Sequence, residues 1–170
     1  MVDTRSERAA RILQTIIYAN LGTVDEDGAP RVSPVRYNYD PSLNIYWASD
    51  KANEHSRNIR RDPRLFLVIY DSTVPEGQGE GVYLQAKAYE VNDPEEVVAY
   101  RTIKKGSGAH DPKQFLGNAI RRVYKAVPEK VWMNDAEVNE RGKFIRDYRV
   151  EVPLESIVEQ LQSSHAYAQR

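Results

Sequence analysis

A cluster of hydrogen-bond donors lies between residues 31 and 56, around a predicted turn from a strand into a short basic helix. An arginine binds a phosphate through two hydrogen bonds, and serine, asparagine and neutral histidine add single donors. The free N–H groups at the start of a helix favour the same negative charge. The combination suits one phosphate monoester. The donors are Arg31, Arg36, Ser49, Lys51, Asn53, His55 and Ser56.

The helix that follows this turn is strongly basic, with Arg57, Arg60, Arg61 and Arg64 in it or just after it. Runs of charge on a helix usually face water, so the same residues also fit an ordinary solvated surface. The residues alone leave both interpretations open.

Several familiar catalytic arrangements are absent from the sequence. It has no cysteine, which excludes disulfides, thiolate nucleophiles and cysteine metal sites. His55, His110 and His165 are widely spaced and form no HExxH or related pattern, so no metal site is expected. There is no GxSxG elbow and no phosphate loop of the GxxxxGK[ST] type. If the protein is an enzyme, we expect a cofactor to carry the chemistry.

Length and charge narrow the class of protein further. A chain of 170 residues suits one domain with a full hydrophobic core, here residues 1–170. The net charge of −1 gives no general attraction to nucleic acid or to an anionic membrane. No stretch resembles a signal peptide or a membrane span. We therefore expect a cytoplasmic protein with no nucleic-acid or membrane partner.

The donors are positioned by a strand–turn–helix–strand unit. Residues 45–48 read IYWA, an apolar strand, and a polar turn leads from them into a helix at residues 52–61. Asp62 precedes Pro63 and ends this helix, because the residue before a proline is pushed out of the helical conformation. Residues 65–70, LFLVIY, then form an apolar run of strand length. The helix N-terminus therefore lies just past the end of the first strand.

The chain before this unit is predicted to form one helix and a three-stranded meander. Apolar residues spaced by three and four predict a helix over residues 4–17, with Thr4 and Glu7 as a capping box. Tight turns separate the three strands and favour antiparallel pairing. The strands are expected at residues 18–24, 31–39 and 44–48.

The chain after this unit adds more strands and peripheral helices. The glycine-rich segment 71–81 contains GQGEG, but a strand and not a helix follows it, so we interpret it as a mobile surface loop and not as a nucleotide loop. Strands are predicted at 82–91, 122–127, 130–133 and 144–152, helices at 92–105, 111–117 and 153–162, and a frayed tail after them. The predicted fold is mainly β, an antiparallel Greek-key barrel with peripheral helices, because closure removes exposed strand edges.

Three segments carry a resemblance to a known family. They read RVSPVR at residues 31–36, IYWASDKANEHSRNIRRDPRLFLVIYD at 45–71 and GVYLQAKAYEV at 81–91. The chain resembles the pyridoxamine 5'-phosphate oxidase-like flavoproteins, the FMN-binding split-barrel family. The resemblance implies an FMN-dependent oxidoreductase that acts on a small organic substrate. It also implies a homodimer with the flavin at the subunit interface.

The resemblance assigns roles to individual positions. The two arginines of the second strand match the family's spacing of cations and would neutralise the flavin phosphate, while the polar side chains of residues 49–56 would donate hydrogen bonds to it. Residues 33–35 and 47–48 would border the flavin ring, and the tryptophan of a later strand would pack near it. The implied cofactor residues are Arg31, Ser33, Val35, Arg36, Trp47, Ala48, Ser49, Lys51, Asn53, His55, Ser56 and Trp132.

One departure from the family pattern keeps other cofactors open. Glu54 and His55 stand where the oxidase itself places two cations. We therefore do not expect pyridoxamine phosphate to be oxidised. A deazaflavin coenzyme on the same fold would need further basic residues, which Lys51, Arg57 and Arg60 could supply.

Two further alternatives keep the barrel. A haem-binding or haem-handling protein would need an axial ligand, for which His110 and His165 are the candidates. A non-catalytic flavin-binding protein would need no residues beyond the cofactor site.

Overall fold

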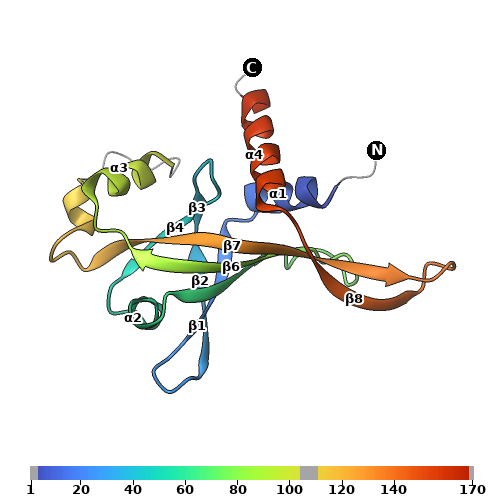
Figure 1. Ribbon diagram of the computed structural model, residues 1–170, viewed down its shortest axis with the longest axis horizontal. Coiled ribbons are helices and arrows are strands. Elements are labelled where there is room, and N and C mark those ends of the chain that lie inside the picture. Colours follow the sequence, from blue (N-terminus) through green and yellow to red (C-terminus); the bar gives the residue numbers. More distant parts are fainter. Residues whose placement is uncertain (1–3, 104–110, 169–170) are drawn as a thin grey trace.

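The computed structural model describes residues 4–103 and 111–168, without the side chains of residues 101, 102 and 164–168. The strands are β1 (Tyr18–Val24), β2 (Pro30–Arg36), β3 (Asn38–Tyr39), β4 (Ile45–Asp50), β5 (Arg64–Tyr70), β6 (Gly81–Glu90), β7 (Arg121–Val138) and β8 (Phe144–Glu151). The helices are α1 (Arg5–Thr15), α2 (Glu54–Arg61), α3 (Pro94–Ile103), the 3₁₀ helix η1 (Pro112–Phe115) and α4 (Leu154–Ala168) (Figure 1).

The strands of the described chain form one antiparallel sheet that curls round on itself. Its order is β2-β1-β5-β6-β7-β4-β3, and β8 pairs with β7. Strands β2 and β3 stand at opposite ends of this order, but only Tyr37 separates them in the chain. The two ends of the sheet therefore lie next to each other without pairing, as in a split barrel, and the prediction of a mainly antiparallel barrel fold is confirmed.

The predicted antiparallel pairings of the first three strand segments are confirmed, but the second segment is not one continuous strand. The expected strand 31–39 breaks at Tyr37, so that β2 pairs with β1 while β3 pairs with β4. Tyr37 leaves the ladder because its N–H donates to the carbonyl of Ile17 and its buried hydroxyl donates to the carbonyl of Leu13. Strand β4 then pairs with β7, which lies about 70 residues further along the chain.

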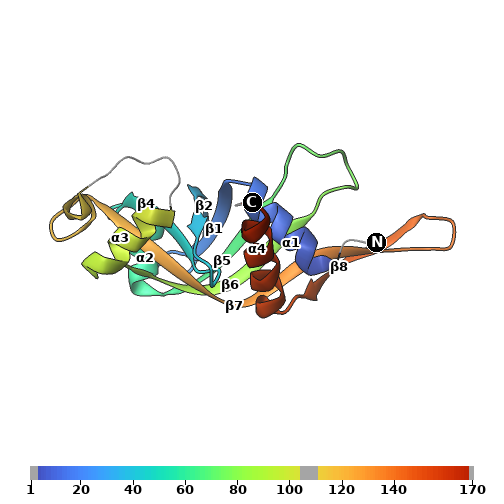
Figure 2. The ribbon, with the colours of Figure 1, turned by 90° about the horizontal axis from the view of Figure 1, so that it is seen from above.

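The barrel interior is filled by alternate residues of the strands, as the period of two requires. Trp47 and Tyr124 are fully buried there, and their rings stack with centroids 5.7 Å apart. Helix α1 has the predicted capping box at Thr4 and Glu7, and it packs with α4 against this core (Figure 2). A smaller cluster lies under α3 and η1 and contains Tyr46, Tyr100 and Phe115. The two ends of the barrel thus carry different helices.

Three predicted elements differ in extent from the observed ones. The strands expected at 122–127 and 130–133 are one strand, β7. Pro128 has no N–H to donate to the ladder, and a bulge at this point lets the strand continue past it. The last helix does not end at Gln162 but continues to Ala168. The short helix at 111–117 is a 3₁₀ turn. Residues 104 and 105, expected to end the preceding helix, lie outside the described residues.

The end of β7 and β8 form a hairpin that extends away from the barrel (Figure 1). Segment 71–80 is a loop with no helix or strand, as predicted. No helix in the described part of the chain is long and apolar enough to cross a membrane.

Candidate functional site

A pocket of about 250 Å³ lies between β2, β4 and the start of α2, with α3 and the first residue of β7 completing its wall. Its lining contains two arginines and no carboxylate. The lining residues are Pro34, Val35, Arg36, Asn38, Ala48, Ser49, Asn53, His55, Tyr100 and Arg121. A negatively charged group therefore meets positive charge here without a competing acid.

The turn into α2 is built by local hydrogen bonds to Asp50. The Ala52 N–H donates to its carboxylate at 2.7 Å, and the buried Ser56 hydroxyl donates to its carbonyl at 2.8 Å. Asn53 is the N-cap residue, but its side chain makes no capping hydrogen bond and lines the pocket instead. The free amides at the start of α2 are thus held near the pocket wall.

His55 is the polar side chain most enclosed in the pocket wall, with 7% of its surface exposed. Its Nε2 lies 2.9 Å from the Ser49 hydroxyl. Burial lowers the pKa of His55, an effect that the nearby Glu54 carboxylate partly opposes. The ring is therefore neutral at pH 7 and pairs with the hydroxyl as an uncharged donor or acceptor.

The charge of the pocket comes from Arg36 and Arg121. Neither guanidinium makes a hydrogen bond or an ion pair with any residue that the structure describes. The Arg121 guanidinium lies 5.8 Å from the centroid of the Phe115 ring, which supports it without neutralising it. Both arginines keep their hydrogen-bond donors available to a ligand.

Arg31, which the sequence assigns to a phosphate, is placed differently. Its Nε lies 2.8 Å from the Asp25 carboxylate and 3.3 Å from that of Glu54, and its side chain is outside the pocket lining. Glu54 stands at a position where the family pattern has a cation. Its carboxylate pairs with Arg31, and so occupies the guanidinium that would otherwise be available to a bound anion.

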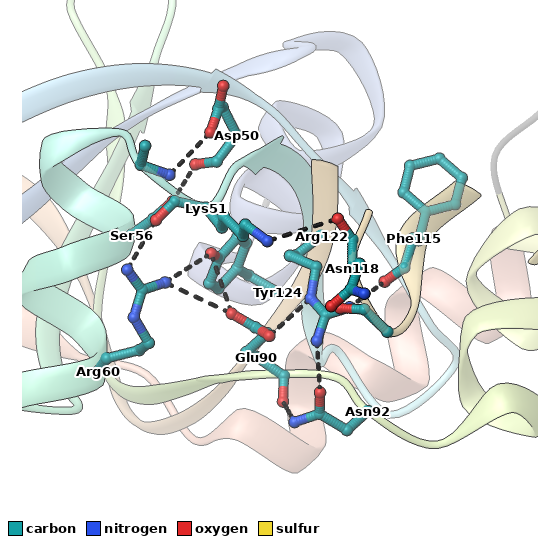
Figure 3. A network of polar contacts seen from close by, with 12 residues as sticks. Asp50, Lys51, Ser56, Arg60, Glu90, Asn92, Phe115, Asn118, Arg122 and Tyr124 are labelled. Atoms are coloured by element: carbon teal, nitrogen blue, oxygen red, sulfur yellow. Dashed lines mark hydrogen bonds and ion pairs between the residues drawn. The ribbon is translucent and has the colours of Figure 1, made fainter. Parts of the chain in front are cut away.

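The basic residues considered for a longer coenzyme are engaged with the protein itself, and Figure 3 shows two of them, Lys51 and Arg60. Arg60 donates to the Lys51 carbonyl at 2.7 Å, and Arg57 donates to the carbonyl of Ala52. The Lys51 ammonium lies 3.5 Å from the carbonyl of Asn118. These three side chains brace the turn and do not line the pocket.

The remaining predicted residues are divided between the pocket and the barrel wall. Val35 and Ala48 line the pocket, whereas Trp47 points into the core on the opposite face of β4. Ser33 is half-buried on β2 and outside the lining. Trp132 packs on the outer face of the sheet, with its ring centroid 6.1 Å from that of Phe66.

Sequence reasoning missed Asn38, Tyr100 and Arg121. They come from β3, α3 and β7, and they meet the pocket through long-range pairing. Arg121 stands opposite Asp50 in the β4–β7 ladder. No local pattern gives that register.

The chain thus forms a split antiparallel barrel with a positively charged pocket between a strand edge and a basic helix. The sequence matches the family model described as pyridoxamine 5'-phosphate oxidase over residues 6–135. The chain therefore belongs to the pyridoxamine 5'-phosphate oxidase-like family, as the resemblance indicated. No curated protein matches the chain significantly.

Several solved structures share the fold at low sequence identity. A haem-binding protein from Mycobacterium smegmatis has a TM-score of 0.67 and 20% identity, over 94% of this chain and 62% of that one, so this chain spans less than two thirds of it. General stress protein 26 from Bacillus anthracis has a TM-score of 0.56 and 15% identity, over 83% and 97% of the two chains. An F420 reductase has a TM-score of 0.54 and 19% identity, over 72% and 94%.

Proposed function

We propose that this protein binds FMN in the pocket between β2, β4 and α2 and acts as an oxidoreductase on a small organic substrate. The observation that carries the proposal is the pocket lining, which has no carboxylate and two arginines that form no ion pair with any described residue. Membership of the oxidase-like family supports a flavin as the ligand.

The chain's own residues would hold and orient the cofactor. Arg36 and Arg121 supply the positive charge, and Ser49, Asn53 and His55 offer single hydrogen bonds at the start of α2. The ring edge would lie along the backbone of residues 33–35, where β2 is an edge strand that keeps donors and acceptors free. A bound flavin would supply the redox chemistry, and the protein would supply position and charge.

The pocket donors fit a phosphate monoester better than a neutral ligand. A buried neutral histidine can accept a proton when an anion arrives, because a nearby negative charge favours the charged ring. The two arginines have fixed charge and can each give two parallel hydrogen bonds. This donor set requires an acceptor with several oxygens.

The experiment that tests the proposal is the visible spectrum of the freshly purified protein, with mass spectrometry of whatever heat releases. We expect a flavin spectrum and one FMN per chain, or recovery of that spectrum after FMN is added. A colourless protein that binds no added FMN would overturn the proposal. Reduction of the bound flavin by a nicotinamide donor or an organic substrate then separates an oxidoreductase from a non-catalytic flavin-binding protein.

The outer face of the sheet is the proposed dimer surface. Proteins of this family are typically dimeric. This face carries apolar and aromatic side chains on neighbouring strands, with Val32 69% exposed and Phe66, Tyr83 and Trp132 partly exposed. We expect light scattering to give a dimer mass and the variant Val32→Glu to give a monomer, whereas Val138→Glu on the distant hairpin should stay dimeric.

A deazaflavin is the second candidate, since the F420 reductase shares the fold and Arg121 adds a cation that the sequence pattern did not include. Against it, Lys51, Arg57 and Arg60 are bound to carbonyl groups of the protein. Parallel titrations with FMN and with the deazaflavin coenzyme distinguish the two. Tighter binding of the deazaflavin would replace FMN in the proposal.

The haem alternative rests on the fold shared with the M. smegmatis haem-binding protein. His110 lies outside the described residues, and the side chain of His165 is not described. A haem titration of the wild type and of both His→Ala variants tests it, because loss of an axial ligand would shift the Soret band.

A further inference from the structure

A second and larger pocket adjoins the first. Its volume is about 590 Å³, and it lies between the end of α1, the β3 turn and α4. Arg36 and Asn38 line both pockets, so the two cavities meet at the end of β2. The lining residues are Leu13, Gln14, Ile16, Ile17, Arg36, Tyr37, Asn38, Tyr39, Asp40, Pro41, Ile103, Leu161 and Gln162.

The wall of this pocket is mainly apolar. Helix α1 contributes Leu13, and the segment after it contributes Ile16 and Ile17, while Leu161 comes from α4. A cavity of this size with an apolar wall suits a molecule with a substantial hydrocarbon or aromatic body. A small polar metabolite would leave most of that wall without contacts.

The polar groups of the wall favour a negative charge at one end. Asp40 is the carboxylate in the lining, and it is already used, because it accepts from the N–H of Ser42 and of Asn44 at 2.9 Å and from the Asn44 amide at 2.7 Å. Arg36 is the cation in the lining, and no described residue neutralises it. Arg36 therefore keeps its hydrogen-bond donors for a ligand, whereas the oxygens of the charged Asp40 are occupied by neutral donors.

A second donor stands beside this arginine in the chain. The Tyr39 hydroxyl is half-buried and makes no hydrogen bond with any residue in the described ranges. Burial raises its pKa, so it stays protonated and can donate. The neighbouring Tyr37 differs, because its hydroxyl is already committed to the Leu13 carbonyl at 3.1 Å. The lining of the second pocket thus offers one guanidinium and one hydroxyl to a ligand.

We propose that this second pocket is the substrate site and that it takes a largely apolar organic anion, such as an aromatic carboxylate or sulfonate. The apolar body lies among the α1 and α4 side chains, and the acidic group meets Arg36 and Tyr39. The boundary at Arg36 and Asn38 brings the bound molecule next to the cofactor pocket. The role as a substrate site rests on the proposed function, but the binding of an apolar anion does not.

The test uses a pair of fluorescent probes that share an apolar body. The anionic probe is 8-anilinonaphthalene-1-sulfonate, and the neutral probe is N-phenyl-1-naphthylamine. Both are titrated into the full-length protein before and after loading with FMN. We expect each to bind saturably at one site per chain, with FMN failing to displace the neutral probe. Displacement of that probe by FMN would place it in the first pocket and overturn the proposal.

Three variants locate the probes. Arg36→Gln should weaken the anionic probe at least about fivefold and the neutral probe less than about twofold, because it removes charge and keeps the apolar wall. Ile17→Glu should weaken both at least about fivefold, since Ile17 is 54% exposed and the change puts a carboxylate in the wall without disturbing the core. The control Val74→Glu, in the loop after β5, should change neither.

Two outcomes would overturn the assignment. Unchanged binding of both probes to Ile17→Glu would place them elsewhere on the protein. If Arg36→Gln weakened the binding of both probes equally, the site would not select for a negative charge. A chain that binds the probes as expected but no flavin would contradict the proposed function and leave the apolar anion site standing.

Discussion

Arg121 and Arg122 are neighbours at the start of β7, yet their guanidinium groups have opposite surroundings. Arg122 is 8% exposed and gives all its hydrogen bonds to the protein (Figure 3). It donates to the Glu90 carboxylate at 2.7 Å, to the Asn92 amide oxygen at 2.9 Å and to the carbonyls of Phe115 and Gly117 at the end of η1. Arg121 lines the candidate pocket and has no anionic partner among the described residues.

The difference shows that the partners of an arginine decide its role. Successive residues of a strand point to opposite faces, so one arginine is directed to the interior mouth of the barrel and the next to the pocket. The same division holds between Arg31, which pairs with two carboxylates, and Arg36, which pairs with none in the described part of the chain. Arginines without internal partners are the ones that remain available to a ligand.

The largest expected effect concerns Arg122. Replacing it with methionine should lower the free energy of unfolding by about 3–5 kcal/mol, because removal of one partner leaves the Glu90 carboxylate, whose side chain is only 15% exposed, without its main counter-ion. Arg60 stays 3.4 Å from that carboxylate and would hold the loss near the lower value. Urea unfolding followed by circular dichroism measures the change.

The matched control is Arg121→Met on the same strand. Its side chain has no ion pair to lose, so we expect a change below about 1 kcal/mol in the same urea experiment. Equal destabilisation by the two variants would show that Arg121 also holds the fold together and would break the comparison.

The next effect concerns cofactor affinity. Arg36→Gln and Arg121→Met should each weaken FMN binding by about 10- to 100-fold, since a hydrogen bond to a charged group contributes about 1.5–3 kcal/mol. Isothermal titration of FMN into the cofactor-free protein measures the dissociation constant. Arg64→Ala is the control, because Arg64 is tied to Asp62 at 2.6 Å and lies outside the pocket. An equal loss of FMN affinity in the control variant would show that the pocket arginines do not bind the cofactor specifically.

Much of the barrel could be predicted because its signals are local. The apolar run of β5, the capping box at Thr4 and the tight turn at Gly28 all act within a few residues. The strand–turn–helix unit is local too, and it brings Ser49 and His55 within 2.9 Å.

The misses arise where distant pairing overrides a local signal. Pro128 normally interrupts a strand, but a bulge beside Ala86 lets β7 continue. Tyr37 lies inside an apparently continuous strand, but tertiary hydrogen bonds take it out of the ladder. Arg121 reaches the pocket through the β4–β7 pairing, which no short-range pattern specifies.

A smaller effect should follow from releasing Arg31. Glu54 is one of the two carboxylate partners of Arg31, and its negative charge would also repel a phosphate at the start of α2. The variant Glu54→Gln removes this charge. We expect FMN to bind about three- to tenfold more tightly, as expected for removing one like charge from a partly exposed site. The same titration measures it.

The double variant tells which residue is responsible. Arg31→Ala should cost little FMN affinity in the wild type, where the side chain is neutralised, and more in the Glu54→Gln background. If it costs the same in both, Arg31 binds the cofactor as the family pattern implies, and its pairing with Glu54 is incidental.

The smallest effect is the response of His55 to pH. Burial lowers the pKa of His55 from the ordinary value of 6.5, so near and below this pH the unfolded chain binds more protons at His55 than the folded chain does. The free energy of unfolding of the cofactor-free protein should therefore fall as the pH drops below about 6.5, because stability rises with pH wherever the unfolded state binds more protons. His55→Gln should flatten this slope.

A phosphate in the pocket favours the charged ring, so saturating FMN should reduce the difference between wild type and variant. Thermal unfolding of both proteins between pH 5 and 8, with and without FMN, measures it. A difference that FMN leaves unchanged would mean that the phosphate does not lie against His55, and the anion would then belong to the two arginines alone.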